Sequence, residues 1–164
     1  MPVCRPSYVQ QPIAALPPAG VTPAETIRFT VVFGVEEGRV ALRYEQDKTR
    51  NQDYIAIARD ALVEIVLQSE QLYFSKDMDA VTTKDALAAF YGGLEYDGYD
   101  EKLDRYRVAR FTARYNRGGR YDTTHAFNIN VDFLQGICPE NGPKWIGMTI
   151  DPDIKNPPPK LTHS

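Results

Sequence analysis

The alternation of apolar and polar residues over residues 105–134 constrains the fold of this chain more than any other feature of its sequence. Over residues 127–133, phenylalanine, isoleucine and valine alternate with asparagine and aspartate. This period of two is typical of a β-strand with one face in a core and the other in water. Residues 105–115 alternate in the same way, and Gly118-Gly119 lies between the two runs. Because a Gly-Gly pair adopts the positive φ of a tight reversal, the stretch predicts a β-hairpin.

The same period predicts strands elsewhere in the chain. Residues 25–35 and 40–45 predict a second hairpin around Gly38, and residues 72–74 and 146–150 predict shorter strands. Residues 53–68 fit two patterns, because their apolar residues also fall on one face of a helix. We predict strands there, since β-branched residues such as Ile55, Ile57 and Ile65 favour extended backbone.

One short helix is predicted in the irregular segment 75–104. The run Thr82-Thr83-Lys84-Asp85 precedes residues 86–90 as an N-cap precedes a helix, and Gly92-Gly93 would end that helix.

Together these patterns predict an all-β fold. We expect a single antiparallel β-sandwich, Ig-like in form, with about seven or eight strands and one short helix. At 164 residues the chain is long enough for one core without metal or disulfide support. The proline distribution predicts a flexible arm over residues 1–24, the sandwich over residues 25–156 and a proline-rich tail over residues 157–164.

Composition narrows the classes of function. The net charge of −3, with lysine and arginine scattered among acidic residues, provides no basic field for nucleic acid. No apolar run approaches the roughly twenty residues that span a membrane. The first residues lack the pattern of a secretory signal, so we expect a cytoplasmic protein. Cys4 and Cys138 are interpreted as free thiols.

The C-terminal stretch carries a family resemblance. Residues 151–157 read Asp-Pro-Asp-Ile-Lys-Asn-Pro and follow the last predicted strand, and the prolines are expected to end all strand pairing. This ending resembles the closing motif of the DP-EP family of small bacterial β-sandwich proteins, and the strand order over about residues 25–159 is similar. The irregular segment 75–104 and the proline-rich arm depart from that pattern. The family has no assigned activity, so the resemblance implies a sandwich fold and an uncharacterised bacterial protein without known functional residues.

Two clusters invite a functional interpretation. His125 near Asp122 is an arrangement that could serve a general base, but no Gly-x-Ser-x-Gly elbow supplies a nucleophile. We therefore interpret His125 as structural. Asp97, Asp100 and Asp104 recur over residues 95–104, but not in the register of an EF-hand loop, so a solvated acidic loop is preferred over a calcium site. No cofactor, metal or phosphate-loop motif is predicted.

Trp145, the only tryptophan, has the strand parity opposite to Ile146, Met148 and Ile150 and is expected to point away from the core. It must then be covered by the chain's own segment 75–104, by the N-terminal arm, by a ligand or by a second chain. We predict that Trp145, Tyr96 and Tyr99 belong to an interface.

These observations predict a non-enzymatic soluble binding or assembly module that associates with a protein partner or with itself. The alternatives are a small hydrolase using His125 and Asp122, and a calcium-dependent ligand-binding β-sandwich using Asp97, Asp100 and Asp104.

Overall fold

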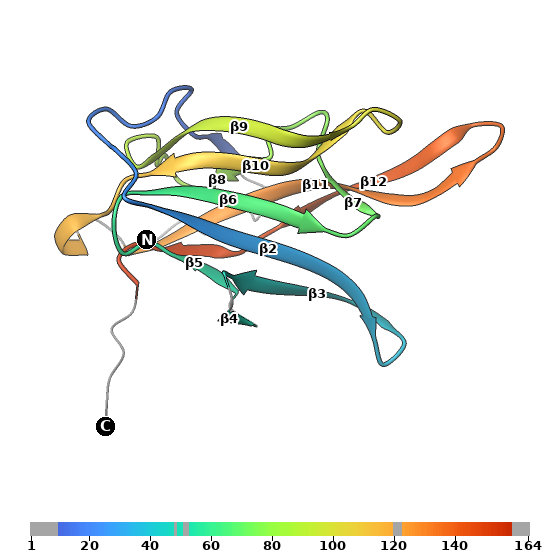
Figure 1. The fold of residues 1–164 in the computed structure, drawn as a ribbon, viewed down its shortest axis with the longest axis horizontal. Coiled ribbons are helices and arrows are strands. Elements are labelled where there is room, and N and C mark those ends of the chain that lie inside the picture. Colours follow the sequence, from blue (N-terminus) through green and yellow to red (C-terminus); the bar gives the residue numbers. More distant parts are fainter. Residues whose placement is uncertain (1–9, 48, 51–52, 120–122, 159–164) are drawn as a thin grey trace, which may run out of the picture.

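The computed structural model describes residues 10–47, 49–50, 53–119 and 123–158, and in it two β-sheets face each other across one core (Figure 1). One sheet has the strand order β4 (Thr49–Arg50), β3 (Arg39–Gln46), β2 (Glu25–Glu36), β6 (Ala61–Gln68), β10 (Arg105–Ala113) and β9 (Tyr91–Asp100). The other has the order β1 (Gln11–Pro12), β8 (Val81–Thr83), β11 (Thr124–Cys138), β13 (Asp153–Lys155) and β5 (Tyr54–Ala56), with β7 (Leu72–Phe74) and β12 (Gly142–Ile150) also paired to β11.

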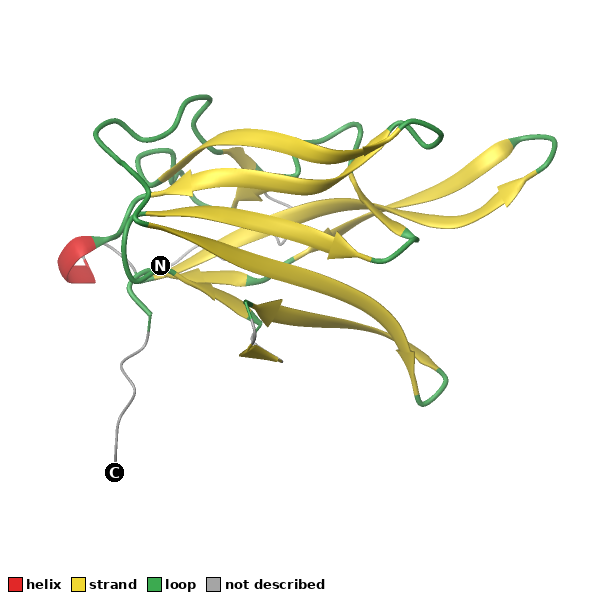
Figure 2. Cartoon of the chain, in the orientation of Figure 1, coloured by secondary structure: helices red, strands yellow, loops and turns green. Residues whose placement is uncertain are grey.

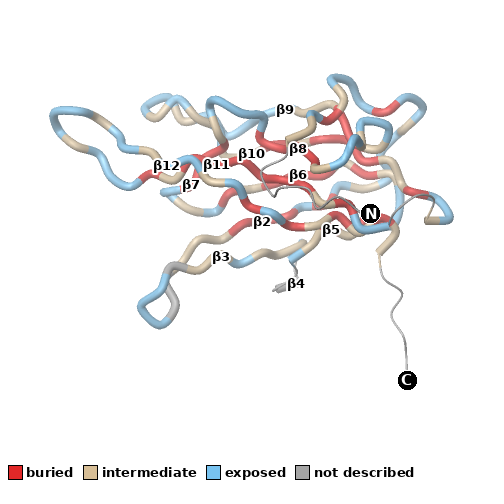
Figure 3. The backbone as a smooth tube through the Cα atoms, turned by 180° about the vertical axis from the view of Figure 1, so that it is seen from behind, coloured by how far each residue is buried: buried red, intermediate tan, exposed pale blue. Residues whose placement is uncertain are grey.

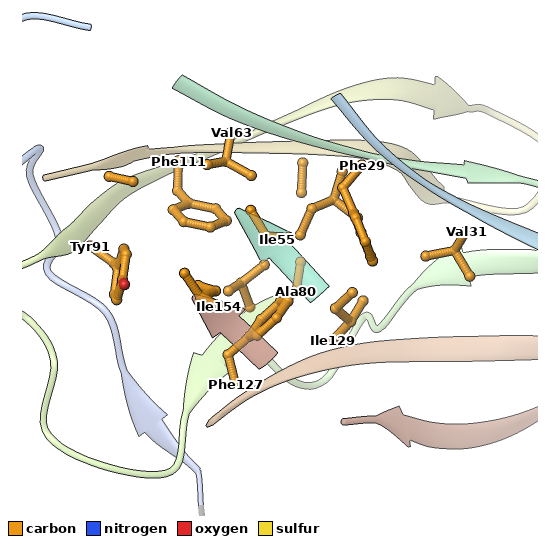
Figure 4. Close-up of a cluster of buried hydrophobic side chains, with 14 of the residues drawn as sticks. Phe29, Val31, Ile55, Val63, Ala80, Tyr91, Phe111, Phe127, Ile129 and Ile154 are labelled. Atoms are coloured by element: carbon orange, nitrogen blue, oxygen red, sulfur yellow. The ribbon is translucent and has the colours of Figure 1, made fainter. Parts of the chain in front are cut away.

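Alternating apolar side chains fill the space between the sheets. Figure 4 shows residues of both sheets packed together in this core, among them Phe29, Val63, Phe111, Phe127, Ile129 and Ile154. All six are fully buried. Figure 3 shows that the buried residues lie along the central parts of the strands, whereas the hairpin tips are exposed. Burial of large apolar side chains of this kind contributes about 1.5–3 kcal/mol each and is the main force that holds the sheets together.

The prediction of a nearly all-β chain is confirmed (Figure 2). The hairpin over residues 25–45 is present as β2 and β3, and Gly38 in its turn has a φ of 75°. Residues 53–68 form strands β5 and β6 rather than a helix. Val63, Ile65 and Leu67 of β6 point into the core, as alternation predicted.

The prediction that all strands are antiparallel is wrong, because both sheets are mixed. Strand β2 runs parallel to β6 over eight residue pairs, and β13 runs parallel to β5. After the β2–β3 hairpin the chain crosses to the other sheet through β5 and then returns beside β2, and such a crossover leaves the two strands parallel. The Ig-like arrangement stays a prediction.

The hairpin predicted over residues 105–134 does not form. Both edges of β10 are already paired, with β6 and β9, so β11 joins the opposite sheet. Gly118 and Gly119 have the predicted positive φ, 75° and 63°, but they lie in the turn that carries the chain between the sheets. The buried Asn116 fixes this crossing, since its backbone N donates to Asn156 Oδ1 (2.7 Å) and its Nδ2 donates to the Asn156 carbonyl (3.0 Å).

The short helix predicted at residues 86–90 is a single turn. Its backbone bonds run from Phe90 N and Tyr91 N to the Leu87 carbonyl (3.0 and 3.1 Å), and β9 begins directly afterwards. Five residues are too few to offset the cost of helix nucleation. The only helical element among the described residues is the 3₁₀ turn at Arg117–Gly119.

Strand pairing also continues in both terminal segments. Residues Asp153–Lys155 form β13, although the prolines there were expected to end pairing, and Pro152 lies just outside the paired residues. The proline-rich arm is described from Gln10 onward; there β1 pairs with β8 and Ile13 is buried. The remainder of the arm and residues 159–164 of the tail lie outside the described residues, as does Cys4. Cys138 is a free thiol. In the described ranges, no helix has the length and apolar character needed to span a membrane.

Phe111 is fully buried between the sheets, so we predict that the stability of the protein depends strongly on its side chain. We expect Phe111→Ala to lower the free energy of unfolding by about 3–5 kcal/mol, because the ring leaves a cavity that the sheets cannot close. Urea denaturation followed by circular dichroism measures this change. Leu16→Ala is the control, because Leu16 is 76% exposed and its loss should leave stability nearly unchanged. Equal effects of the two changes would contradict the core described above.

Candidate functional site

The polar face of β11 is buried, although alternation predicted that it faces water. Asn128, Asn130 and Asp132 are only 0%, 1% and 8% exposed. Segments of the same chain cover them: Asn130 and Asn128 both donate to Thr82 Oγ1, and Asn130 Nδ2 also donates to Gln10 Oε1 (3.0 Å). Buried polar groups of this kind need hydrogen-bond partners, so this face holds other segments in place.

Asn130 fixes both ends of the loop formed by residues 75–79. Ser75 N donates to the Asn130 carbonyl (3.0 Å), and Asn130 N donates to the Ala80 carbonyl (2.9 Å). Its side-chain Nδ2 donates to the Asp79 carbonyl (2.8 Å). Within the loop, Ser75 Oγ accepts hydrogen bonds from Asp77 N and from Met78 N. The loop therefore has a defined conformation beside β11.

Asp132 joins this loop to the opposite sheet. Its Oδ2 accepts hydrogen bonds from Lys76 N (3.2 Å) and from Arg105 Nε (2.8 Å) on β10. The Arg105 side chain is 13% exposed and that of Asp132 is 11% exposed, so this ion pair is largely removed from water. Arg105 Nη1 donates to the Leu103 carbonyl (2.9 Å), and the Arg105 guanidinium carbon lies 3.8 Å from the centre of the Trp145 ring system. Arg105 is thus held on three sides.

The loop and the β9–β10 hairpin enclose a pocket of about 310 Å³, which we call the tyrosine pocket. It is lined by residues 75–79, Phe74, Tyr96, Asp104, Arg105 and Tyr106. The rings of Tyr96 and Tyr106 lie 5.3 Å apart, and those of Tyr99 and Tyr106 lie 4.9 Å apart. Tyr96 Oη accepts a hydrogen bond from Ala80 N (3.0 Å), which fixes this ring against the loop.

Asp104 is held between a cation and a hydroxyl at the edge of this pocket. Its Oδ2 lies 2.5 Å from Lys76 Nζ, and its Oδ1 accepts a hydrogen bond from Tyr99 Oη (2.6 Å). The Lys76 ammonium, and then the Tyr99 hydroxyl, hold the pKa of Asp104 below its usual range. The hydrogen bond to Asp104 raises the pKa of Tyr99. Near neutral pH, Asp104 is therefore an ionised hydrogen-bond acceptor and a poor proton donor.

The tyrosine pocket thus combines three kinds of recognition group. Tyrosine ring faces can stack on a planar ligand, ionised carboxylates can accept hydrogen bonds, and Lys76 and Arg105 supply positive charge. A second pocket, of about 400 Å³, is apolar and is lined by Phe33, Leu42, Phe133, Ile146 and Met148. It offers a polar ligand no hydrogen-bonding side chain. The tyrosine pocket is therefore the better candidate site.

The predicted interface residues Trp145, Tyr96 and Tyr99 all lie at this end of the molecule. Trp145 packs against Arg105, and Tyr73 meets its ring edge-on at 5.5 Å. Tyr96 lines the pocket, and Tyr99 binds Asp104 at its edge. An interface with a partner protein or a second copy at these residues stays a prediction.

The described residues of the other two predicted clusters have separate partners. His125 is 3% exposed and its Nδ1 lies 2.5 Å from Tyr91 Oη, whereas Asp122 lies outside the described residues. Asp97 pairs with Arg110, and the Asp100 carboxylate accepts a hydrogen bond from Leu103 N. Asp104 pairs with Lys76, as described above. In the part of the chain that the structure describes, no group of three or more His, Cys, Asp or Glu residues could hold a metal ion.

Sequence reasoning did not identify Lys76, Arg105, Tyr106 or Asp132 as site residues. One local signal was present in Arg105-Tyr106-Arg107, where arginines flank a tyrosine at the start of a strand. The contact between Arg105 and Asp132, however, joins two sheets across 27 residues of sequence. Only the fold places them together.

The fold and the pocket define a nearly all-β protein with a site suited to a polar aromatic small molecule. A model of the pNTSase1 family, described as a predicted novel nucleotide synthetase, matches residues 3–159. Since the match covers nearly the whole sequence, the chain belongs to this family. No curated protein matches the chain.

This match corrects the function predicted from sequence. The prediction of a non-enzymatic binding or assembly module is wrong, because the family is described as an enzyme family. The same finding supersedes the alternatives of a hydrolase using His125 and Asp122 and of a calcium-dependent binder. The match does not test the resemblance to the DP-EP family, which stays a prediction.

We predict that Asp132→Ala destabilises the protein by about 3 kcal/mol, because it leaves the Arg105 guanidinium largely buried without its carboxylate. Urea denaturation measures the loss, and the fluorescence of Trp145 should change because its ring covers Arg105. Asp104→Asn is the control: the ion pair of Asp104 with Lys76 is half-exposed and asparagine tolerates the φ of 54° at this position, so stability should change little. If both variants were equally stable, Asp132 would not hold the two sheets together at this site.

Proposed function

We propose that this protein is an enzyme of nucleotide synthesis and that the tyrosine pocket binds its nucleotide. The family description supports the reaction class. The observation that supports this location is that neighbouring tyrosine rings, tilted towards one another, lie in one pocket with fixed charged side chains. Both features are needed, because a nucleotide presents a planar base together with polar and charged groups.

The tyrosine rings suit the base. Tyr106 is 39% exposed and Tyr96 is 37% exposed, so both rings present surface to a ligand. Stacking of a base on an aromatic side chain is worth about 1–3 kcal/mol and requires no particular base. The ring of Tyr96 is fixed by Ala80 N and by an edge contact with Phe74, so little side-chain freedom is lost on binding.

The charged groups are also fixed before a ligand arrives. Arg105 is held by Asp132, the Leu103 carbonyl and the Trp145 ring. Asp104 is held by Lys76 and Tyr99. Groups oriented by their neighbours cost little reorganisation during a reaction, which is the property that active sites require.

The test measures nucleotide binding and product formation with the purified chain. We expect Tyr106→Ala to weaken nucleotide binding about tenfold, as loss of one stacking contact predicts. Tyr106→Phe should retain binding because the ring remains. Isothermal titration with nucleotides measures affinity, and chromatography with mass spectrometry detects new nucleotide products formed from nucleoside triphosphates and magnesium.

Arg39→Ala is the control for a general loss of positive charge, since Arg39 is exposed at the start of β3 and lines neither pocket. It should leave binding unchanged. Binding that survives Tyr106→Ala would place the site elsewhere, and failure to bind or convert any nucleotide would refute the proposed function.

A further inference from the structure

The tyrosine pocket carries an excess of negative charge. Two cations line it, Lys76 and Arg105, against the three carboxylates of Asp77, Asp79 and Asp104. Asp132, directly behind Arg105, adds a fourth carboxylate. A free polyphosphate would meet net repulsion there, since like charges at short range oppose one another.

Both cations already have carboxylate partners. A phosphate on Arg105 would compete with Asp132, whose pair with it is largely buried and costly to break. Lys76 lies against Asp104, but this pair is half-exposed and can open towards solvent. Any phosphate contact is therefore best made at the outer edge of the pocket, beside Lys76.

The carboxylates of Asp77 and Asp79 differ from those of Asp104 and Asp132. Neither forms an ion pair with another residue that the structure describes. Asp77 N nevertheless donates a hydrogen bond to Ser75 Oγ, and the Asp79 carbonyl accepts one from Asn130 Nδ2, so the backbone that carries both carboxylates is fixed. Ionised carboxylates only accept hydrogen bonds, so a complementary ligand must present donors.

A nucleoside has such donors beside a flat ring. Its ribose hydroxyls and the exocyclic amino group of adenine, guanine or cytosine donate hydrogen bonds, and acidic side chains accept bonds from both kinds of group in known nucleotide sites. The rings of Tyr96 and Tyr106 lie in the same pocket as Asp77 and Asp79. Base stacking and donor recognition can therefore occur together.

We infer that the pocket recognises the nucleoside part of the nucleotide, with its hydroxyl or amino donors on the carboxylates of Asp77 and Asp79 and its phosphates directed outward past Lys76. This inference rests on the proposed function and deepens it. It assigns the substrate class as a nucleoside or a nucleotide of low charge, rather than a free polyphosphate.

The test compares adenosine, AMP and ATP in the presence of a chelator that removes divalent cations. We expect adenosine to bind at least tenfold more tightly than ATP, and added salt to narrow that difference by screening the repulsion. The quenching of Trp145 fluorescence reports binding, because its ring contacts Arg105 in the pocket wall. Titration calorimetry provides an independent affinity.

Variants test the two carboxylates. The double change Asp77→Asn and Asp79→Asn should weaken adenosine binding and strengthen ATP binding. The ratio of the affinity for adenosine to the affinity for ATP should therefore fall at least tenfold. Both residues are exposed, so the variant should fold, which its melting temperature verifies. Comparison of adenosine with 2′-deoxyadenosine and inosine separates ribose donors from the base amino group; a loss of affinity with either one supports the inference.

The inference and the proposed function fail in different ways. If ATP binds more tightly than adenosine without divalent cations, and Lys76→Ala removes that advantage, the pocket selects phosphate. The inference is then wrong while the proposed function stands. If no nucleoside or nucleotide binds under any condition, both are wrong. An unchanged preference in the Asp77/Asp79 double variant would also overturn the inference.

Discussion

The ion pair between Asp132 and Arg105 is the interaction on which the candidate site depends. It joins β11 of one sheet to β10 of the other, with both side chains largely buried. A buried ion pair contributes little net stability, but loss of either partner is costly because the remaining charge is buried alone. This pair therefore fixes where the two sheets meet. The same carboxylate oxygen of Asp132 also accepts a hydrogen bond from Lys76 N, so Asp132 also positions the loop of residues 75–79.

Strand β11 has this role because, among the described strands, it pairs with the largest number of others. It pairs with β7 and β8 and with β12 and β13, and its apolar side chains enter the core. Its polar side chains, Asn128, Asn130 and Asp132, are covered by other segments and hold them through hydrogen bonds. The apolar side chains of β11 thus pack in the core on one face of the strand, and its polar side chains support the site on the other face.

Much of the strand content could be predicted from sequence, because alternation is local. The hairpin around Gly38 follows from side-chain periodicity alone, whereas the extended conformation of residues 53–68 follows from periodicity together with the β-branched residues in that stretch. Which sheet a strand joins is not local: residues 105–115 and 124–138 alternate like a hairpin, yet β6 and β9 occupy both edges of β10. Alternation also shows that Asn130 and Asp132 face away from the core, but it cannot show that another segment covers them. For that reason the sequence predicted that the polar face of β11 is exposed to solvent, whereas in the structure this face is buried and holds the segments that form the site.

The pocket differs from familiar phosphate sites in a way that follows from the fold. Phosphate loops place backbone N–H groups at a helix N-terminus, where the helix dipole favours negative charge. Within the described ranges this protein has only one 3₁₀ turn, so it cannot use that device there. Recognition must instead come from side chains at the end of a sheet, where tyrosines supply ring faces and aspartates accept hydrogen bonds. Such a set suits the base and ribose better than the phosphates, which connects the all-β architecture to the kind of ligand that the pocket can hold.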